Sequence, residues 1–214
     1  MADPPPPTAA AAQAAAATAP KAPVTAVAPC PPAKKHAAKG GSTTVSVDDV
    51  NHKVTIETCM EFSGSGATRD YASAAKKQIE DTWSGTMTRN GKLYNVVVKV
   101  DAKVKGAGAA CPNCDPISVE RGTTRMNQTL FGAGKGNQTP DAATDAARPR
   151  RIAHEYGHTL GLPDDYVDSP NGGSVPKDPN RKNNIMSETW PDAAGVLPHP
   201  GQDHYEAVLT SHGW

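Results

Sequence analysis

The stretch RRIAHEYGHTLGLPDDY, from Arg150 to Tyr166, constrains the fold of this chain more than any other part of its sequence. Pro149 precedes it and suits the first turn of a helix, where a missing N–H costs nothing. Gly161 suits the left-handed position that closes a helix. His154 and His158 lie one turn apart on such a helix and face the same way. The sequence therefore predicts a helix with two imidazoles on one side, closed by a glycine.

Two imidazoles at this spacing can hold one zinc ion, each at about 2.0–2.1 Å from the metal. Glu155 follows the first histidine directly and points off the ligand axis. It can therefore act as general base, taking a proton from a zinc-bound water, and then as general acid toward a leaving amine. A catalytic zinc site of this kind still needs a third protein ligand.

The match extends beyond HEYGH. The spacing His154-Glu155-x-x-His158-x-x-Gly161-x-x-Asp164 resembles the extended motif of the metzincin zinc peptidases, in the snapalysin-like branch whose third ligand is aspartate. The resemblance therefore implies that Asp164 is the third ligand, and a carboxylate oxygen binds zinc at about 2.0–2.2 Å. Asp165 is the alternative ligand if the turn is one residue longer, or else a hydrogen-bond partner of a histidine N–H. The register favours Asp164.

A second mark agrees with this resemblance. Metzincins carry a methionine turn beneath the zinc, and NNIMSET places Met186 where it would take that packing role. Some metzincins have a tyrosine two residues after this methionine, but this chain has Glu188 there. Three other side chains are then candidates for stabilising the oxyanion, or for supporting and structural roles: Tyr166, His204 and Tyr205.

A different zincin plan, that of the gluzincins, takes its third ligand from a glutamate on a later helix. Glu188 is the nearest downstream glutamate, but it follows a loop rich in Asn and Pro. Glu206 lies in a predicted helix without a supporting motif around it. This plan ranks below the one in which Asp164 closes the site.

Composition divides the chain into two parts. Residues 1–41 are rich in Ala and Pro with almost no large apolar side chains, which predicts a disordered or polyproline-like leader. Residues 42–214 are predicted to form one α+β domain, zincin/metzincin-like, with a mixed sheet and the motif helix as active-site helix. An irregular C-terminal subdomain would contain the Met-turn, and residues 163–184 are predicted to be an irregular loop.

Apolar periodicity predicts the other elements of the domain. Strands are expected at residues 43–47, 52–62 and 92–105, and an edge strand within 125–132. A helix is expected at 67–83 and a short one at 201–214. The predicted buried face of the first helix comprises Tyr71, Ala75, Ile79 and Trp83. The apolar positions of the strand at 92–105 are Leu93, Val96, Val98, Val100 and Val104.

Charge, the N-terminal sequence and the cysteines limit the possible partners and location of the chain. Lys+Arg and Asp+Glu both number 22, so nothing calls for nucleic acid or an anionic membrane as partner. The N-terminus lacks the features of a Sec signal, so we expect export by a non-Sec route, or otherwise retention in the cytosol. Cys111 and Cys114 form a CxxC, half of a four-cysteine zinc site, which we interpret as a loop-closing disulfide or two free thiols. With Cys30 and Cys59, three full pairings stay open.

These observations favour a zinc endopeptidase with one catalytic ion. The resemblance implies a protein or peptide substrate bound along an edge strand, Met126 to Phe131. The chain is also similar to toxin or effector zincin domains of bacterial injection systems. In that reading the leader would contact a secretion apparatus, and an immunity or inhibitor protein would be a partner. The alternatives are a peptidoglycan amide hydrolase using the same unit, and a catalytically silent, metal-stabilised binding module, against which the intact Glu155 argues.

Overall fold

The computed structural model describes residues 42–106, 113–121, 129–133, 148–170, 174–181, 184–187 and 198–214. The predicted leader, residues 1–41, lies outside these ranges. The described part is a mixed α+β fold, as the sequence predicts. Its main sheet has the strand order β3-β4-β2-β5-β6, with β1 paired to β2. The strands are β1 Thr44–Asp48, β2 Lys53–Ser63, β3 Gly85–Arg89, β4 Lys92–Val104, β5 Asp115–Arg121 and β6 Leu130–Ala133.

The sheet is mixed in direction. The central strand β2 runs parallel to both of its long neighbours, β4 and β5, and β5 runs parallel to β6. The two remaining pairs, β1 with β2 and β3 with β4, are antiparallel. Strand β6 ends the order of described strands, which agrees with an edge strand in this region, although Met126 lies outside the described residues.

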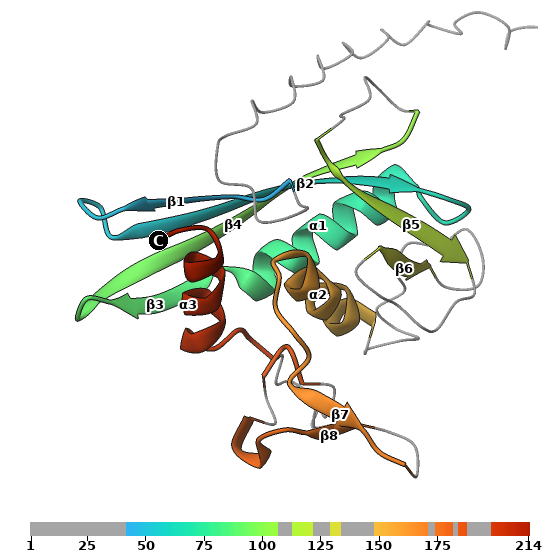
Figure 1. Cartoon of the computed structure of the whole chain (residues 1–214). Coiled ribbons are helices and arrows are strands. Elements are labelled where there is room, and N and C mark those ends of the chain that lie inside the picture. Colours follow the sequence, from blue (N-terminus) through green and yellow to red (C-terminus); the bar gives the residue numbers. More distant parts are fainter. Residues whose placement is uncertain are drawn as a thin grey trace, which may run out of the picture.

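The helices α1 Arg69–Trp83, α2 Arg148–Thr159 and α3 Gln202–Ser211 lie on one side of the sheet (Figure 1). Helix α1 begins at Thr68, whose side chain accepts a hydrogen bond from the Tyr71 amide at 3.0 Å. Such N-caps satisfy an amide that the helix leaves without a partner. The predicted face of this helix is confirmed, because all four of its residues are buried: Tyr71, Ala75, Ile79 and Trp83.

One of the apolar positions on β4 does not face the core. Leu93 is 65% exposed, whereas the neighbouring Tyr94 is only 2% exposed. Side chains alternate between the two faces of a strand, and the buried Val96, Val98 and Val100 share the face of Tyr94. An apolar side chain out of phase with that alternation points to solvent, whatever its hydrophobicity.

The cysteine interpretation also needs correction. Cys114 pairs with Cys59 rather than with Cys111, so the CxxC is neither a closed loop nor a pair of free thiols. Met60 on β2 is the register partner of Asp115 on β5, which brings the preceding residue of each parallel strand into contact. The Cα atoms of Cys59 and Cys114 are 4.6 Å apart, within the range of a disulfide. Cys30 and Cys111 lie outside the described residues.

The predicted irregular loop at 163–184 contains regular structure. Strands β7 Tyr166–Asp168 and β8 Ser174–Pro176 pair as an antiparallel hairpin, followed by a short 3-10 helix at Pro179–Arg181. The β-branched pair Val167 and Val175 lies opposite in register, and both side chains are about half exposed. The hairpin projects below α2 in Figure 1. Its strands are too short for apolar periodicity to mark them in the sequence.

Within the described ranges, no helix combines the length and apolar character needed to cross a bilayer.

Candidate metal centre

The C-terminus of α2 forms the turn that the sequence predicts. Pro149 is the second residue of the helix, and Gly161 has a φ of +88°, the left-handed region that glycine occupies without steric cost. The Gly161 amide donates to the His158 carbonyl at 2.9 Å, and the Leu162 amide donates to the Gly157 carbonyl at 3.0 Å. This pair of bonds is the Schellman arrangement, which caps the last carbonyls of a helix and reverses the chain. The reversal carries Asp164 back toward α2.

Three side chains converge at this turn. Asp164 Oδ1 lies 3.1 Å from Nε2 of His154 and 3.1 Å from Nε2 of His158. All three ligand atoms lie within 4.8 Å of one another. Two atoms that bind one tetrahedral zinc ion are about 3.3 Å apart, given metal–ligand distances of about 2.05 Å. The spacing of these atoms therefore fits a single small metal ion.

Backbone carbonyls fix the orientation of both imidazoles. The Ile185 carbonyl lies 2.8 Å from Nδ1 of His154, and the Leu162 carbonyl lies 2.8 Å from Nδ1 of His158. A carbonyl only accepts hydrogen bonds, so each Nδ1 carries a proton. In a neutral imidazole this leaves the lone pair on Nε2, the atom of each ring that lies beside Asp164. In that state two nitrogen lone pairs and a carboxylate oxygen face the same position. These electron-rich atoms repel one another, so a cation between them is favoured. This donor set suits zinc.

A tight turn at residues 184–187 supports the site from below. The Ser187 amide donates to the Asn184 carbonyl at 3.0 Å, and the Asn184 side-chain oxygen accepts from the Met186 amide at 2.8 Å. The turn also supplies the Ile185 carbonyl that orients His154. All four of its residues are buried. Sequence reasoning marked Met186 but missed Asn184 and the Ile185 carbonyl, because a backbone oxygen leaves no signal in the sequence.

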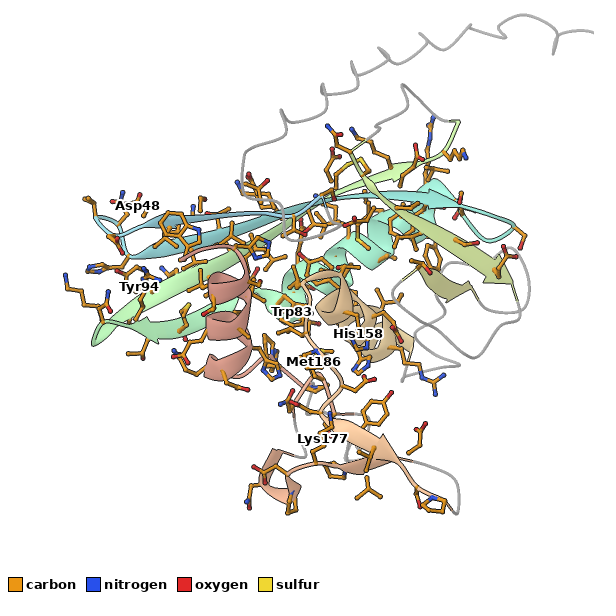
Figure 2. The ribbon with its side chains drawn as sticks, viewed as in Figure 1. Asp48, Trp83, Tyr94, His158, Lys177 and Met186 are labelled. Carbon is orange, nitrogen blue, oxygen red and sulfur yellow. A yellow bond between two sulfur atoms is a disulfide. The ribbon has the colours of Figure 1, made fainter. Side chains whose placement is uncertain are left out.

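The Met186 side chain packs directly against α2. Met186 is fully buried, and a Cβ added to Gly157 would lie 2.3 Å from its sulfur and 3.0 Å from Trp83 Cζ2. Gly157 lies between the two histidines, so the absence of a side chain there lets the methionine approach the helix between them. Figure 2 shows Met186 close below His158, where α2 meets the segment leading to the hairpin.

The two adjacent aspartates have different surroundings. Asp164 joins the histidines, whereas Asp165 Oδ2 accepts from the Asn184 amide at 2.8 Å and lies 3.5 Å from His204 Nε2. The Asp165 backbone amide donates to the Met186 carbonyl at 2.9 Å. The register of the turn thus brings Asp164, not Asp165, to the imidazoles.

The remaining candidates fall into two groups. Tyr166 is partly buried, and its ring centroid lies 6.0 Å from that of His154. His204 is 4% exposed and packs edge-on against Trp83, with ring centroids 6.5 Å apart. Tyr205 is 3% exposed, and its hydroxyl donates to the Trp83 carbonyl at 3.1 Å. The Tyr166 ring thus lies beside His154, one of the three residues that could hold a metal ion.

The three candidate glutamates differ in their position relative to the two histidines. Glu155 lies on α2 next to His154 and is 8% exposed. Glu206 is exposed on α3 and accepts a hydrogen bond from Gln202 at 2.7 Å, so it is not part of the ligand group. Glu188 lies outside the described residues. Among the described side chains, Asp164 supplies the carboxylate that joins the two histidines.

Helix α2, which carries the two candidate ligand histidines, is anchored on its other side by two buried hydrogen bonds. The Tyr156 hydroxyl is 2.9 Å from Thr58 Oγ1 on β2, and Trp83 Nε1 donates to the Ala153 carbonyl at 2.7 Å. Burial raises the pKa of Tyr156 above its usual value, so this hydroxyl stays protonated through the neutral range. Sequence reasoning missed both bonds, since each joins residues far apart in the chain.

Comparison of the chain with protein-family models, with curated proteins and with solved structures gives no match.

Proposed function

We propose that the chain is a zinc-dependent endopeptidase. One observation carries the proposal: two Nε2 atoms, each with its proton fixed on the opposite nitrogen, and one carboxylate oxygen converge from His154, His158 and Asp164. This donor set is that of a catalytic zinc site, with three protein ligands and one position left for water or substrate. Bound zinc supplies Lewis acidity, polarising a carbonyl and lowering the pKa of water to about 7.

The residues of the chain supply the remaining chemistry. Glu155 follows the first ligand on the same helix and acts as general base, accepting a proton from the attacking water. It then returns that proton to the leaving amine. The Ile185 and Leu162 carbonyls hold the two imidazoles in the ligating tautomer. Tyr166, beside His154, is the candidate for stabilising the oxyanion, and Met186 takes the packing role of a Met-turn.

The metal is tested by measuring zinc per chain with plasma mass spectrometry. We expect about one zinc per wild-type chain and a large loss in Asp164→Ala. Asp168→Ala is the matched control, because Asp168 is an exposed aspartate on β7 outside the ligand group. Wild-type chains without zinc, after purification with zinc supplied, would contradict both the zinc endopeptidase and a binding module stabilised by zinc.

The chemistry is tested separately with a quenched, unfolded protein substrate. Glu155→Gln should abolish cleavage while zinc content stays at the wild-type level, and Glu206→Gln, on the exposed face of α3, should cleave normally. Cleavage by Glu155→Gln at the wild-type rate would exclude Glu155 as the base. A parallel digest of peptidoglycan distinguishes the two amide substrates: new amines released there, with the protein substrate intact, would reassign the enzyme.

We also propose that the chain acts in an oxidising compartment, as a delivered effector or toxin would. The disulfide between Cys59 and Cys114 supports export, because disulfides persist outside the reducing cytosol. Expression of residues 42–214 in the periplasm and in the cytosol of the same bacterium tests this proposal. Growth arrest that depends on Glu155 would support a toxin role, and normal growth with active protease present would contradict it.

A further inference from the structure

Asp165 connects three segments around the proposed metal site. Its amide donates to the Met186 carbonyl at 2.9 Å, and its own carbonyl accepts from the Lys177 amide at 2.8 Å. Its carboxylate accepts from the Asn184 side-chain amide at 2.8 Å. The tight turn and the hairpin thus both hold the residue that follows Asp164. A change at Asp165 therefore acts on the position of the Asp164 carboxylate, which is 39% exposed.

His204 brings the C-terminal helix to the same carboxylate. Its Nδ1 accepts a hydrogen bond from the Gly201 amide at 2.8 Å, so the neutral ring carries its proton on Nε2. That nitrogen lies 3.5 Å from Asp165 Oδ2, which is a favourable electrostatic contact. At 4% exposure, His204 is buried at the start of α3, with its Nε2 near the Asp165 carboxylate.

The His204 ring also contacts Trp83, the residue that anchors helix α2. It packs edge-on against Trp83, whose Nε1 donates to the Ala153 carbonyl, one residue before His154. The imidazole therefore lies between the loop that carries the third ligand and the tryptophan that anchors the helix carrying the first two. Polar partners behind metal ligands fix ligand orientation, and their loss commonly costs about 10–100-fold in metal affinity.

We infer that Asp165 and His204 are positioning residues for the metal: through their contact, the C-terminal helix α3 holds Asp164 at the two histidines and sets the affinity for zinc. The inference rests on the proposed zinc site. Neither residue touches the reacting atoms in this role. His204 thereby has a function other than stabilising the oxyanion.

Two substitutions of His204 separate this role from simple support of α3. Asparagine places an oxygen near the former Nδ1 and can still accept from the Gly201 amide, but it has no group at Nε2. Glutamine places an N–H group near the former Nε2, beside Asp165, but it loses the hydrogen bond from the Gly201 amide. Asp165→Asn removes the charge of the aspartate, and Asp168→Asn is the matched control on β7.

The experiment measures the zinc dissociation constant of each full-length variant by competition with a chelator, alongside the thermal unfolding of the zinc-free protein. We expect Asp165→Asn and His204→Asn each to weaken zinc binding about 10–100-fold. The double variant Asp165→Asn/His204→Asn should bind zinc as tightly as the single variant with the lower affinity, because both changes break the same contact. His204→Gln should bind zinc nearly as well as wild type while unfolding at a lower temperature. Asp168→Asn should match wild type in both measurements.

Two results would overturn the inference, and they differ from each other. If wild type binds zinc and His204→Asn binds it equally well, the positioning role is wrong and the zinc site stands. If His204→Asn and His204→Gln weaken zinc binding in proportion to their loss of thermal stability, His204 only stabilises the fold. A wild-type chain that binds no zinc overturns the proposed function and this inference together.

Discussion

Gly157 provides a test in which two physical effects oppose each other. Replacing glycine by alanine inside a helix normally stabilises it by about 1 kcal/mol, because glycine loses more backbone entropy on folding. Here the new Cβ would lie 2.3 Å from the Met186 sulfur and 3.0 Å from Trp83 Cζ2. Both neighbours are fully buried, so the methionine must leave its position and repack in a filled core.

The overpacking should exceed the gain in helix propensity. Overpacking a filled core costs about 1–3 kcal/mol. Subtracting the propensity gain of about 1 kcal/mol leaves a net loss of about 1 kcal/mol in the free energy of unfolding for Gly157→Ala. Urea unfolding followed by circular dichroism, on zinc-free protein, measures this difference. A variant more stable than wild type would refute the packing argument.

In a Met186→Ala background, the expected effect of Gly157→Ala on the free energy of unfolding has the opposite sign. Met186→Ala removes the clashing side chain at a cost of about 2–5 kcal/mol for the cavity. In that background, Gly157→Ala should stabilise the protein, because the propensity gain remains and the contact with the Met186 sulfur is gone. The 3.0 Å approach to Trp83 Cζ2 remains, but the tryptophan ring can shift by a few tenths of an ångström into the cavity. Ser73 is exposed near the middle of α1, so the difference between Ser73→Ala and Ser73→Gly calibrates the propensity term in the same protein. Loss of stability from Gly157→Ala in both backgrounds would show that Met186 is not the cause.

Two further predictions concern the rest of the fold. The Cys59–Cys114 disulfide closes a separation of 55 residues, so a Cys59→Ala/Cys114→Ala variant should lose about 4 kcal/mol of unfolding free energy; an unchanged urea midpoint would show that the bridge adds no stability. Burial raises the pKa of Tyr156 and of Tyr205, so the folded state holds both phenol protons after the unfolded chain releases them near pH 10. The contribution of the two tyrosines to the free energy of unfolding is therefore fully present below about pH 10. Above that pH it declines by up to about 1.4 kcal/mol per pH unit for each tyrosine. Tyr156→Phe should remove about half of that slope between pH 10 and 11, and an unchanged slope would contradict the assignment.

Local chemistry is what the sequence predicts well in this chain. His154, His158 and Gly161 belong to one helix and its cap, so their relative positions follow from helix geometry. Asp164 follows three residues after the glycine, and so short a segment keeps its side chain near the end of the helix. The buried face of α1 follows equally from its spacing. In each case the geometry is fixed by neighbours along the chain.

What the sequence does not predict is set by contacts between distant segments. The Ile185 carbonyl reaches His154 across 31 residues, and a backbone oxygen has no sequence signature. Cys59 and Cys114 meet because β2 and β5 are adjacent, a fact that depends on strand order rather than on cysteine spacing. The β7–β8 hairpin has strands of three residues, too few for a period of two to register.

The compactness of the ligand set along the chain has a consequence for folding. All three proposed ligands lie between His154 and Asp164, so an unfolded chain can chelate zinc with the same side chains. Binding to the unfolded chain reduces the stabilisation that a ligand gives to the native state. Added zinc should therefore raise the melting temperature by less than its native-state affinity implies. Early in refolding, a metal ion captured by this segment could form the helix terminus before the sheet assembles behind it.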